Sequence, residues 1–211
     1  MKKIHDISIP VKQGMILWPN DPGIKIERSK KIENGSSSNV TELSMGLHTG
    51  THIDAPYHFV DKGIKIEDIT LDTFIGSVQV IEIPDSYGSI SADVIKQFGP
   101  GISHERVLFR TRNSKSWNDS PEFIEDYVAV DLEGSEYLIN SGVKLVGIDY
   151  LSIAPFDDIV RVHQALLKAG IVIIEGLNLN TIHAGTFMMY CLPLKLVGVE
   201  AAPARVILVE G

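Results

Sequence analysis

The sequence predicts a single-domain α/β fold. Two segments with a helical pattern are each followed directly by an apolar run: residues 133–142 precede 144–149, and residues 163–170 precede 171–175. A helix that leads into a buried strand is typical of an α/β layer. The 211 residues suit one domain with a substantial core, and no repeat or linker divides them. We therefore expect residues 1–211 to form one α/β domain.

The first half of the chain is expected to contain mainly strands. Four segments alternate or cluster apolar residues as strands do: residues 6–11 (closed by Pro10), 24–28, 40–47 and 78–83. Three segments rich in glycine, proline or polar residues are expected as connections: residues 14–23, 29–39 and 61–63. The connection over residues 29–39 is expected to be mobile, with a flap as one role for it.

The second half alternates expected helices and strands. Ser91 is an expected N-cap and Gly99 a stop for a helix over residues 91–98. A strand is expected over residues 107–110, and a loop over 114–121 in which Trp117 is a partly exposed packing residue. The helix over 163–170 is expected to start at His163, and two further strands are expected over residues 188–196 and 204–209.

Composition narrows the classes of partner. A net charge of -8 and few basic residues argue against nucleic acid or an anionic membrane, and leave a small molecule as the expected ligand. Cys191 is the single cysteine and cannot form an internal disulfide, so we expect it to be a buried packing residue. The first residues lack the apolar run of a signal peptide, and no run approaches the ~20 residues of a membrane span. We expect a soluble, cytoplasmic protein.

One segment concentrates the chemistry. Three of the seven histidines and an aspartate lie within residues 47–59, at positions His48, His52, Asp54 and His58. Strand alternation puts all four on one face, yet a fully extended chain would separate His48 from Asp54 by roughly 20 Å. A single metal ion, at bonds of about 2 Å, cannot reach both. The segment must therefore curl if both are ligands, which Gly50 and Pro56 permit.

A second group is expected around Glu175, the carboxylate that ends the apolar run over residues 171–175. Burying it unpaired would cost several kcal/mol, so a cationic partner is required. Gly170 reverses the chain and can return Glu175 to the neighbourhood of His163. A structural ion pair would explain these two residues alone, whereas a shared metal explains them together with the histidine segment.

These segments provide five candidate metal ligands: His48, His52, Asp54, His163 and Glu175. A catalytic zinc typically takes three protein ligands and a water, so five are too many for one such ion. Either two ions share a bridging carboxylate, from Asp54 or Glu175, or one ion such as Mn²⁺ takes a higher coordination number. His58 is then free for proton transfer as the catalytic acid/base.

The motif over residues 48–58, with His163 and residues 174–177, closely resembles the putative cyclase family of metal-dependent hydrolases. Bacterial kynurenine formamidases are the best-understood members of that family. The resemblance spans nearly the whole chain and includes four further segments: residues 18–21, 147–149, 192–194 and 202–205. Asn20 stands where many relatives have glycine, and Ala154 precedes Pro155 where formamidases tend to have aspartate. These departures touch no candidate ligand and bear on the substrate.

The resemblance implies a swivelling β/β/α domain around a mixed sheet or barrel flanked by helices, usually in a homodimer or homotetramer. It also implies a two-metal centre, usually of Zn²⁺. One ion would be held by His48, His52 and Asp54, and the other by Asp54, His163 and Glu175. The implied activity is that of an arylformamidase, with hydrolysis of N-formyl-kynurenine to kynurenine and formate, a step of tryptophan catabolism by the kynurenine pathway.

Other functions remain open at this stage. Trp18, in the loop over residues 14–23, either packs beneath that loop or forms a flat wall of a substrate pocket. Aromatic residues near loops suit an aryl amide and suit isatin-like or other cyclic amides equally. His52, Asp54 and His163 also fit the ligand triad of a non-haem iron oxygenase. A binding module with structural zinc would need a closed four-ligand site, which the surplus of ligands and His58 disfavour.

Overall fold

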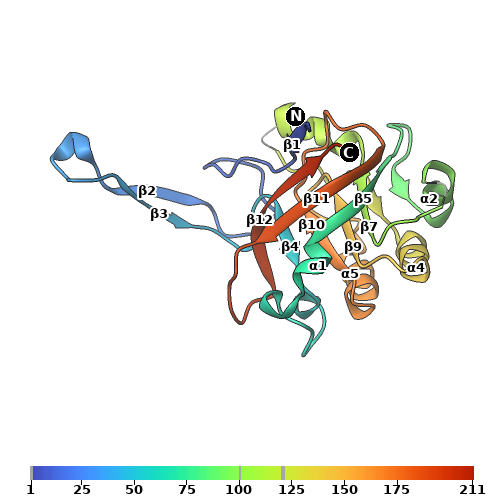
Figure 1. Ribbon diagram of the computed structural model, residues 1–211. Coiled ribbons are helices and arrows are strands. Elements are labelled where there is room, and N and C mark those ends of the chain that lie inside the picture. The colour runs from blue at the N-terminus through green and yellow to red at the C-terminus, as the bar shows by residue number, and fades with distance from the viewer. Residues whose placement is uncertain (1, 100, 120–121) are drawn as a thin grey trace.

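The computed structural model describes residues 2–99, 101–119 and 122–211. Seven strands of these residues form a closed mixed β-barrel (Figure 1). In spatial order the barrel strands are β12 (Ala201–Val209), β11 (Gly185–Pro193), β5 (Ile75–Glu82), β7 (Arg106–Arg110), β9 (Leu145–Ile148), β10 (Val172–Glu175) and β4 (His52–Asp54). Strand β4 pairs with both β10 and β12 and so closes the ring. The expected α/β fold with a central mixed barrel is confirmed.

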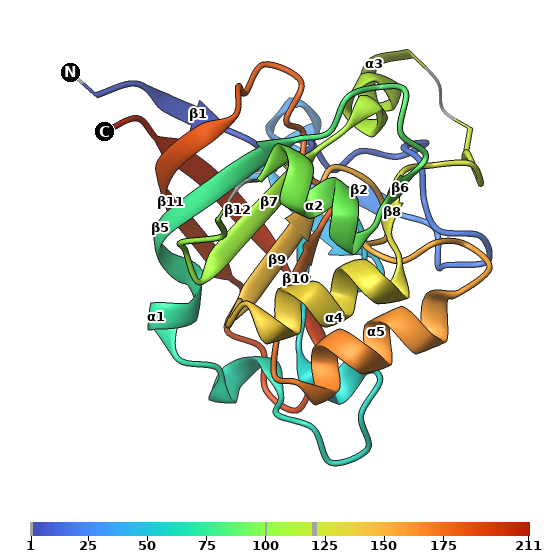
Figure 2. The same cartoon turned by 90° about the vertical axis from the view of Figure 1, so that its right-hand side faces the viewer.

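Helices cover one side of this barrel (Figure 2). The three longest described helices are α2 (Ala92–Phe98), α4 (Leu132–Asn140) and α5 (Ile159–Lys168). Shorter helical segments are η1 (Ile32–Asn34), η2 (Pro56–His58), η3 (Ile66–Asp68), α1 (Leu71–Phe74), η4 (Arg112–Lys115) and α3 (Ser116–Asp119). In the described part of the chain, no helix has the length and apolar character needed to cross a membrane.

The remaining strands lie outside the barrel. Strand β1 (Ile4–Asp6) pairs with the second half of β12, while β6 (Ser89–Ile90) and β8 (Ala129–Val130) form a small parallel pair. Strands β2 (Lys25–Lys30) and β3 (Val40–Ser44) form a hairpin that projects away from the body (Figure 1).

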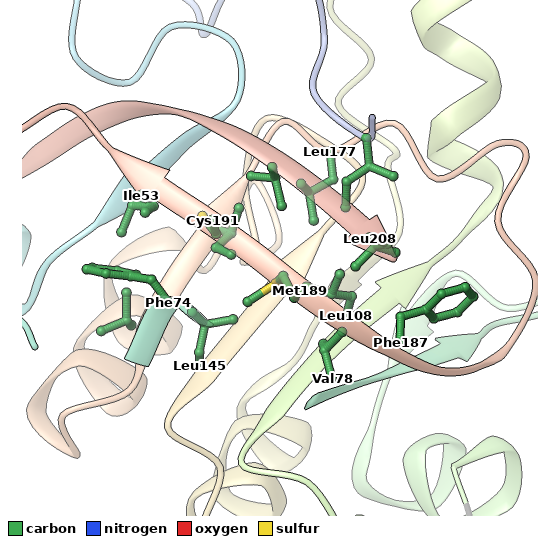
Figure 3. Packing of buried hydrophobic residues seen from close by; sticks show 14 of the residues in the cluster. Ile53, Phe74, Val78, Leu108, Leu145, Leu177, Phe187, Met189, Cys191 and Leu208 are labelled. Carbon is green, nitrogen blue, oxygen red and sulfur yellow. The ribbon is translucent and has the colours of Figure 1, made fainter. Parts of the chain in front are cut away.

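The apolar run over residues 171–174 is buried on both faces, as its composition requires. Val172 and Ile174 belong to the core inside the barrel, which Figure 3 shows, whereas Ile171 and Ile173 belong to the core between the barrel and the helices. Cys191 lies fully buried in the barrel core, so its expected packing role is confirmed.

Several expected boundaries are confirmed by their caps. The side chain of Ser91 accepts a hydrogen bond from the Val94 amide at 3.4 Å, and α2 ends at Gly99 as the sequence indicates. Asp131 caps α4 in the same way by accepting from the Gly134 amide at 2.8 Å.

Three expected elements are corrected by the structure. The strand expected over residues 6–11 ends at Asp6, because the chain leaves β12 and makes only an isolated bridge from Ser8 to Leu177. The loop expected over 114–121 contains η4 and α3 instead, with residues 120–121 outside the described residues. Helix α5 begins at Ile159, so His163 lies one turn inside it rather than at its start.

The connection over residues 29–39 is shorter than expected. Strand β2 continues to Lys30, and the segment after it contains η1, ended by Gly35 in the left-handed conformation. Strand β3 ends at Ser44 instead of residue 47, and residues 47–48 form a turn at the start of the histidine segment.

A buried carboxylate holds the end of β9 to the segment that follows β7. Asp149 accepts hydrogen bonds from the amide and hydroxyl of Thr111, both at 2.8 Å, and from the amide and hydroxyl of Ser114 at 3.2 and 2.7 Å. Burial opposes its charge and raises the pKa of Asp149 to about 6, although these four donors favour the ionised form. The Ser114 hydroxyl in turn accepts from the Leu179 amide at 2.9 Å, so three segments meet at one side chain.

This network predicts that Asp149→Asn will destabilise the fold. The amide keeps one acceptor oxygen and presents an NH₂ group to donors that need an acceptor, which should lower the free energy of unfolding by about 2–4 kcal/mol. Chemical denaturation measures the change. The control is Asp126→Asn, because the Asp126 side chain is 96% exposed and should tolerate the change within about 0.5 kcal/mol. Equal stability of the two variants would contradict a structural role for the network.

Candidate metal centre

Strand register assembles the centre of the site. In the antiparallel pair β10–β4, Glu175 lies opposite His52, and Ile173 lies opposite Asp54. Since alternate residues of a strand share a face, His52 and Asp54 point the same way while Ile53 enters the barrel core. Both carboxylates are almost fully buried, with Asp54 1% and Glu175 4% exposed. The fold therefore places two acids beside a histidine before any ion is bound.

The histidine segment curls, as expected, where two glycines meet. His48 lies in a turn before β4, and Gly50 has a left-handed φ of 71°. Gly176, with φ of 70°, passes so close that a Cβ on it would lie 2.2 Å from the Gly50 carbonyl oxygen. The Thr51 hydroxyl donates to the Gly176 carbonyl at 2.5 Å. Glycine at both positions thus lets the chain after β10 pack against the turn that carries His48.

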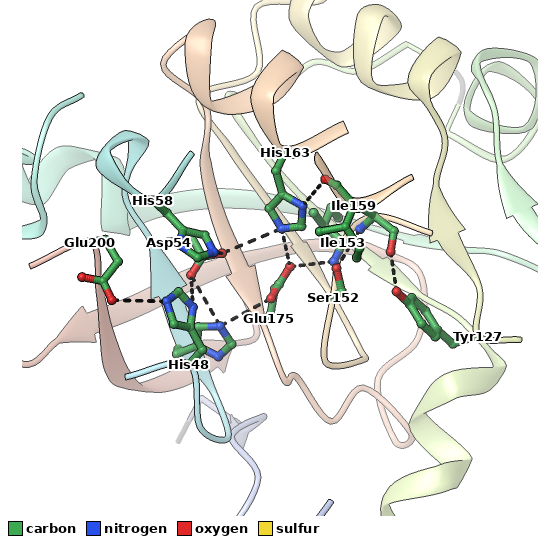
Figure 4. Close-up of polar contacts among 12 residues, drawn as sticks. His48, Asp54, His58, Tyr127, Ser152, Ile153, Ile159, His163, Glu175 and Glu200 are labelled. Carbon is green, nitrogen blue, oxygen red and sulfur yellow. Dashed lines mark hydrogen bonds and ion pairs between the residues drawn. The ribbon is translucent and has the colours of Figure 1, made fainter. Parts of the chain in front are cut away.

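Figure 4 shows His48, His58, His163 and Glu175 gathered around Asp54, and the distances below place His52 in the same group. His48 Nδ1 lies 2.9 Å and His52 Nε2 3.5 Å from Asp54 Oδ1. His58 Nε2 and His163 Nε2 each lie 3.9 Å from Asp54 Oδ2. The structure thus brings segments from β4, η2 and α5 to one carboxylate.

Glu175 faces the same group from β10. Its Oε2 lies 3.4 Å from His52 Nε2, and its Oε1 lies 3.3 Å from His163 Nε2. The expected return of Glu175 to His163 across Gly170 is confirmed. His52 is in reach of both carboxylates, whereas the resemblance grouped it only with His48 and Asp54.

Backbone carbonyls orient two of the imidazoles. His52 Nδ1 lies 2.9 Å from the Gly50 carbonyl, and His163 Nδ1 lies 2.8 Å from the Ile159 carbonyl, so each Nδ1 donates a proton there. The Nε2 atoms face the carboxylates. Burial opposes charge on His163, but Glu175 and Asp54 raise its pKa, and its Nε2 donates to Glu175 Oε1 at 3.3 Å. Once a metal ion replaces the Nε2 proton, the imidazole is the tautomer that metal-binding histidines adopt, with the second nitrogen held by a hydrogen bond.

The acids and histidines shift one another's protonation. Burial opposes charge on His48, but the Asp54 carboxylate, with help from Glu175 and Glu200, raises the pKa of His48 to about 9. Burial alone would raise the pKa of Asp54, yet the neighbouring histidines hold it well below its usual range. Burial also lowers the pKa of His58, and charges on His48 and His163 add to this effect against Asp54. His58 is therefore neutral at neutral pH.

A divalent ion fits this arrangement. Among the described residues, His52 Nε2 and both Asp54 carboxylate oxygens are buried and make no aligned hydrogen bond, although buried polar groups normally have one. Two groups of residues each offer ligand atoms that lie within 4.8 Å of one another inside the group: His48, Asp54 and His58 form one group, and His52, Asp54 and Glu175 form the other. Asp54 belongs to both sets, which is the arrangement needed for a carboxylate shared by two ions. Imidazole and carboxylate ligands suit Zn²⁺, and Mn²⁺ also accepts carboxylates.

A pocket of about 200 Å³ opens over the cluster and is lined by His48, His58, His163 and Glu175. Trp18 and Asp21 line the same pocket. Trp18 also packs edge-on against Phe123, with ring centroids 5.1 Å apart, so it is both a packing residue and a pocket wall. Trp117 does not line this pocket, and its indole nitrogen donates to the Leu177 carbonyl at 2.8 Å.

The loop before Asp21 explains one sequence departure. Asn20 adopts a left-handed φ of 72°, a conformation that favours glycine and that asparagine tolerates better than most residues. The glycine expected at this position and the asparagine present therefore meet the same backbone requirement.

Sequence reasoning missed three neighbours of the site. Glu200 Oε1 lies 3.5 Å from His48 Nε2, and its backbone carbonyl accepts from the Ala55 amide at 2.8 Å. Phe59 stacks on His163 with ring centroids 4.6 Å apart. The Ile153 amide donates to Glu175 Oε1 at 2.7 Å. Only Phe59 had a local signal, its place beside His58, because the other two reach the site through strand pairing and a loop.

Residues 5–155 match the protein family described as "Putative cyclase". A "Kynurenine formamidase" of Salinibacter ruber is 37% identical over 205 residues, covering 96% of this chain and 95% of its own. A solved structure described as a potential metal-dependent hydrolase with cyclase activity is 33% identical, with a TM-score of 0.86 and 100% of this chain covered. "Isatin hydrolase A" of Labrenzia aggregata shares the fold, with a TM-score of 0.83 at 21% identity over 99% of this chain and 93% of its own.

The raised pKa of His48, about 9, predicts that metal binding releases a proton. The imidazolium must become neutral to be a ligand, so the apparent affinity for Zn²⁺ should rise by up to about tenfold per pH unit between about pH 7 and 9. Competition with a chromogenic chelator measures this slope and the stoichiometry, which we expect to reach two ions with one bound more weakly. His48→Gln should flatten the slope. A flat profile in the unaltered protein would show that His48 stays outside the coordination shell.

Proposed function

Because the chain belongs to the Putative cyclase family of metal-dependent hydrolases, we propose that it hydrolyses N-formyl-kynurenine to kynurenine and formate. The observation that supports this best is the set of buried ligand atoms without aligned partners, on His52 and Asp54, beside a pocket whose lining carries histidines, an aromatic wall and a carboxylate. The same proposal treats residues 1–211 as one catalytic domain of the swivelling β/β/α type. It places the reaction in the cytoplasm, consistent with a single buried cysteine.

Distances around Asp54 and Glu175 support a set of ligand roles. We assign His48, His52, Asp54, His163 and Glu175 to hold two divalent ions, Zn²⁺ in the first instance, with Asp54 as the shared carboxylate. Ions at these residues supply Lewis acidity for a carbonyl and activate water for attack at neutral pH. The protein's own contribution is to keep the imidazole tautomers fixed and the carboxylates ionised, through Gly50, Ile159 and Ile153.

His58 is the residue we assign to proton transfer. It is half-buried and lines the pocket, and burial together with the charges of His48 and His163 lowers its pKa against the effect of Asp54 and Glu175. A neutral imidazole can accept a proton as water adds to the formyl carbon, and can then deliver it to the aniline nitrogen as the C–N bond breaks. Formate and the free amine leave, and His58 returns to its neutral form.

The upper part of the pocket suits an aryl ring. Trp18 stands beside Phe156, with ring centroids 5.5 Å apart, and beside Phe123. Edge-on and tilted packing holds the indole in place, which lets its face act as a preformed wall without ordering cost. A flat aromatic substrate can lie against Trp18 while its formamide reaches the floor of the pocket.

Asp21 favours a substrate that carries an ammonium group. It is half-buried in the pocket lining, and no lysine or arginine lines the pocket with it among the described residues. A carboxylate next to an aromatic face is an environment that attracts an organic cation. N-formyl-kynurenine has an ammonium group, whereas isatin has none. Asp21 thus supports the formamide over a cyclic amide, which is the alternative suggested by the shared fold with isatin hydrolase A.

The proposal predicts different losses in two histidine variants. His58→Ala should lower kcat by about 10²- to 10⁴-fold while metal content is retained, because it removes a general acid/base. His52→Ala should lose both activity and metal, since His52 lies between the two carboxylates. Steady-state kinetics and elemental analysis of the same preparations test this. Equal loss of metal in both variants would assign His58 to the coordination shell instead.

A second prediction concerns Asp21 and uses two matched substrates. N-formyl-kynuramine carries an alkyl ammonium, and 2-formamidoacetophenone is a neutral aryl formamide of the same type. Asp21→Asn should lower the ratio of their kcat/KM values by roughly fivefold, equivalent to about 1 kcal/mol for a partly exposed ion pair. Asp157→Asn, outside this pocket, is the control that should keep the ratio.

The same assays distinguish a failure of the proposed reaction from a failure of the role assigned to Asp21. Opening of isatin without turnover of either formamide would favour the cyclic-amide alternative. No hydrolysis of any amide by metal-loaded protein would contradict the proposed function, whereas hydrolysis with an unchanged ratio in the variant would remove only the role of Asp21.

A further inference from the structure

His48 is oriented differently from the other two candidate histidine ligands. His52 and His163 turn Nδ1 to backbone carbonyls and Nε2 to the carboxylates. His48 is reversed, because its Nδ1 lies 2.9 Å from Asp54 Oδ1. Its Nε2 lies 3.5 Å from Oε1 of Glu200, on the outer side of the cluster (Figure 4). The outer nitrogen of His48 thus faces a side chain, whereas those of the other two face the backbone.

The exposure of His48 makes a fixed partner for this nitrogen important. Its side chain is 25% exposed, whereas those of His52 and His163 are 1% and 4% exposed. Neutral imidazole can carry its proton on either nitrogen, and its χ2 torsion has broad minima, so an unheld ring can offer either nitrogen to an ion. Metal-binding histidines avoid this by donating the second N–H to a carboxylate or carbonyl. Within the described residues, Glu200 is the ion-pair partner of His48 Nε2.

The backbone fixes the place from which Glu200 reaches His48. The Glu200 carbonyl accepts a hydrogen bond from the Ala55 amide at 2.8 Å. The next residue, Ala201, lies opposite Asp54 in the β12–β4 pair. The strand register that places Asp54 therefore also places Glu200. The pocket over the cluster is lined by His48 and not by Glu200, so Glu200 acts on the candidate ligand and not on the substrate.

We propose that Glu200 is a positioning residue, which accepts a hydrogen bond from His48 Nε2–H and so commits His48 Nδ1 to the ion held with Asp54. This inference deepens the proposed function and rests on it in taking His48 as a metal ligand. It assigns Nδ1 as the ligand atom of His48, in contrast to Nε2 of His52 and His163. Removal of such an outer partner typically weakens metal affinity by about 10- to 100-fold.

Two substitutions separate orientation from simple attraction. Glu200→Gln keeps an acceptor oxygen and loses the charge, whereas Glu200→Ala loses both. Competition with a chromogenic chelator at one pH measures the affinity for Zn²⁺. Glu200→Ala should lower it by about 10- to 100-fold, and Glu200→Gln should stay within about threefold of the unaltered protein because the hydrogen bond remains.

A matched control removes a carboxylate elsewhere. Glu136 is exposed on α4, so Glu136→Ala should leave the affinity for Zn²⁺ unchanged. Near-UV circular dichroism confirms that each variant is folded. Equal losses in Glu200→Ala and Glu200→Gln would show that only the negative charge matters, and would overturn the positioning role.

Nuclear magnetic resonance reports the orientation directly. Long-range ¹H–¹⁵N correlation spectra of the Zn²⁺-loaded protein show which nitrogen of His48 carries the proton, and His48→Gln identifies its signals. We expect a proton on Nε2 in the unaltered protein and in Glu200→Gln, and a mixture of the two forms in Glu200→Ala. A proton on His48 Nδ1 in the unaltered protein would overturn the proposal.

Hydrolysis provides a separate readout. Glu200→Ala should lose activity at limiting Zn²⁺ in proportion to its loss of metal, and excess Zn²⁺ should restore kcat to within about threefold, since Glu200 does not touch the substrate. Unchanged affinity for Zn²⁺ in Glu200→Ala would overturn the role of Glu200. The affinity and resonance measurements need no turnover. Protein that binds Zn²⁺ as expected but hydrolyses no amide would therefore contradict the proposed function alone.

Discussion

The structure depends on how two buried carboxylates are accommodated. Asp54 and Glu175 are both buried and lie close enough to repel each other when both are ionised. Burial of two unpaired negative charges would oppose folding. Four imidazoles surround them, and backbone amides and carbonyls fix the outer atoms of that group. The fold accommodates this charge because the raised pKa values of His48 and His163 favour positive charge beside the carboxylates when no metal is bound. The residues that stabilise the buried carboxylates are thus also the candidate metal ligands.

Barrel closure provides the second constraint. Strand β4 has only three residues, yet it pairs with β10 on one side and with β12 on the other. The partners on β12 include Ala201 opposite Asp54 and Pro203 opposite His52. The small side chain of Ala201 leaves room for the ligand side chains. Pro203 has no backbone N–H and therefore needs no hydrogen-bond acceptor from β4. A strand too short to be stable alone is held in place by both neighbours and by Ile53 in the core.

Much of the site was visible in the sequence because its signals are local. The spacing of His48, His52, Asp54 and His58, and a glutamate at the end of an apolar run, are unusual without a shared partner. Glu200 and Ile153 carry no such signal, since strand pairing and a loop deliver them from distant segments. The helical turns around Trp117 were missed for a related reason. The polar residues of that segment predict a loop. In the structure, the Thr111 and Ser114 amides donate to Asp149, and the segment forms a helical turn.

The pairing of β4 with two distant strands has a consequence for synthesis on the ribosome. The histidine segment emerges early, but β4 receives its partners only when residues 172–175 and 201–203 have been made. Contacts of such sequence separation form slowly and late. During translation the histidine segment is therefore made well before the strand that brings Glu175 beside it. The candidate metal ligands come together only when the barrel closes, so the site can form no earlier than the fold.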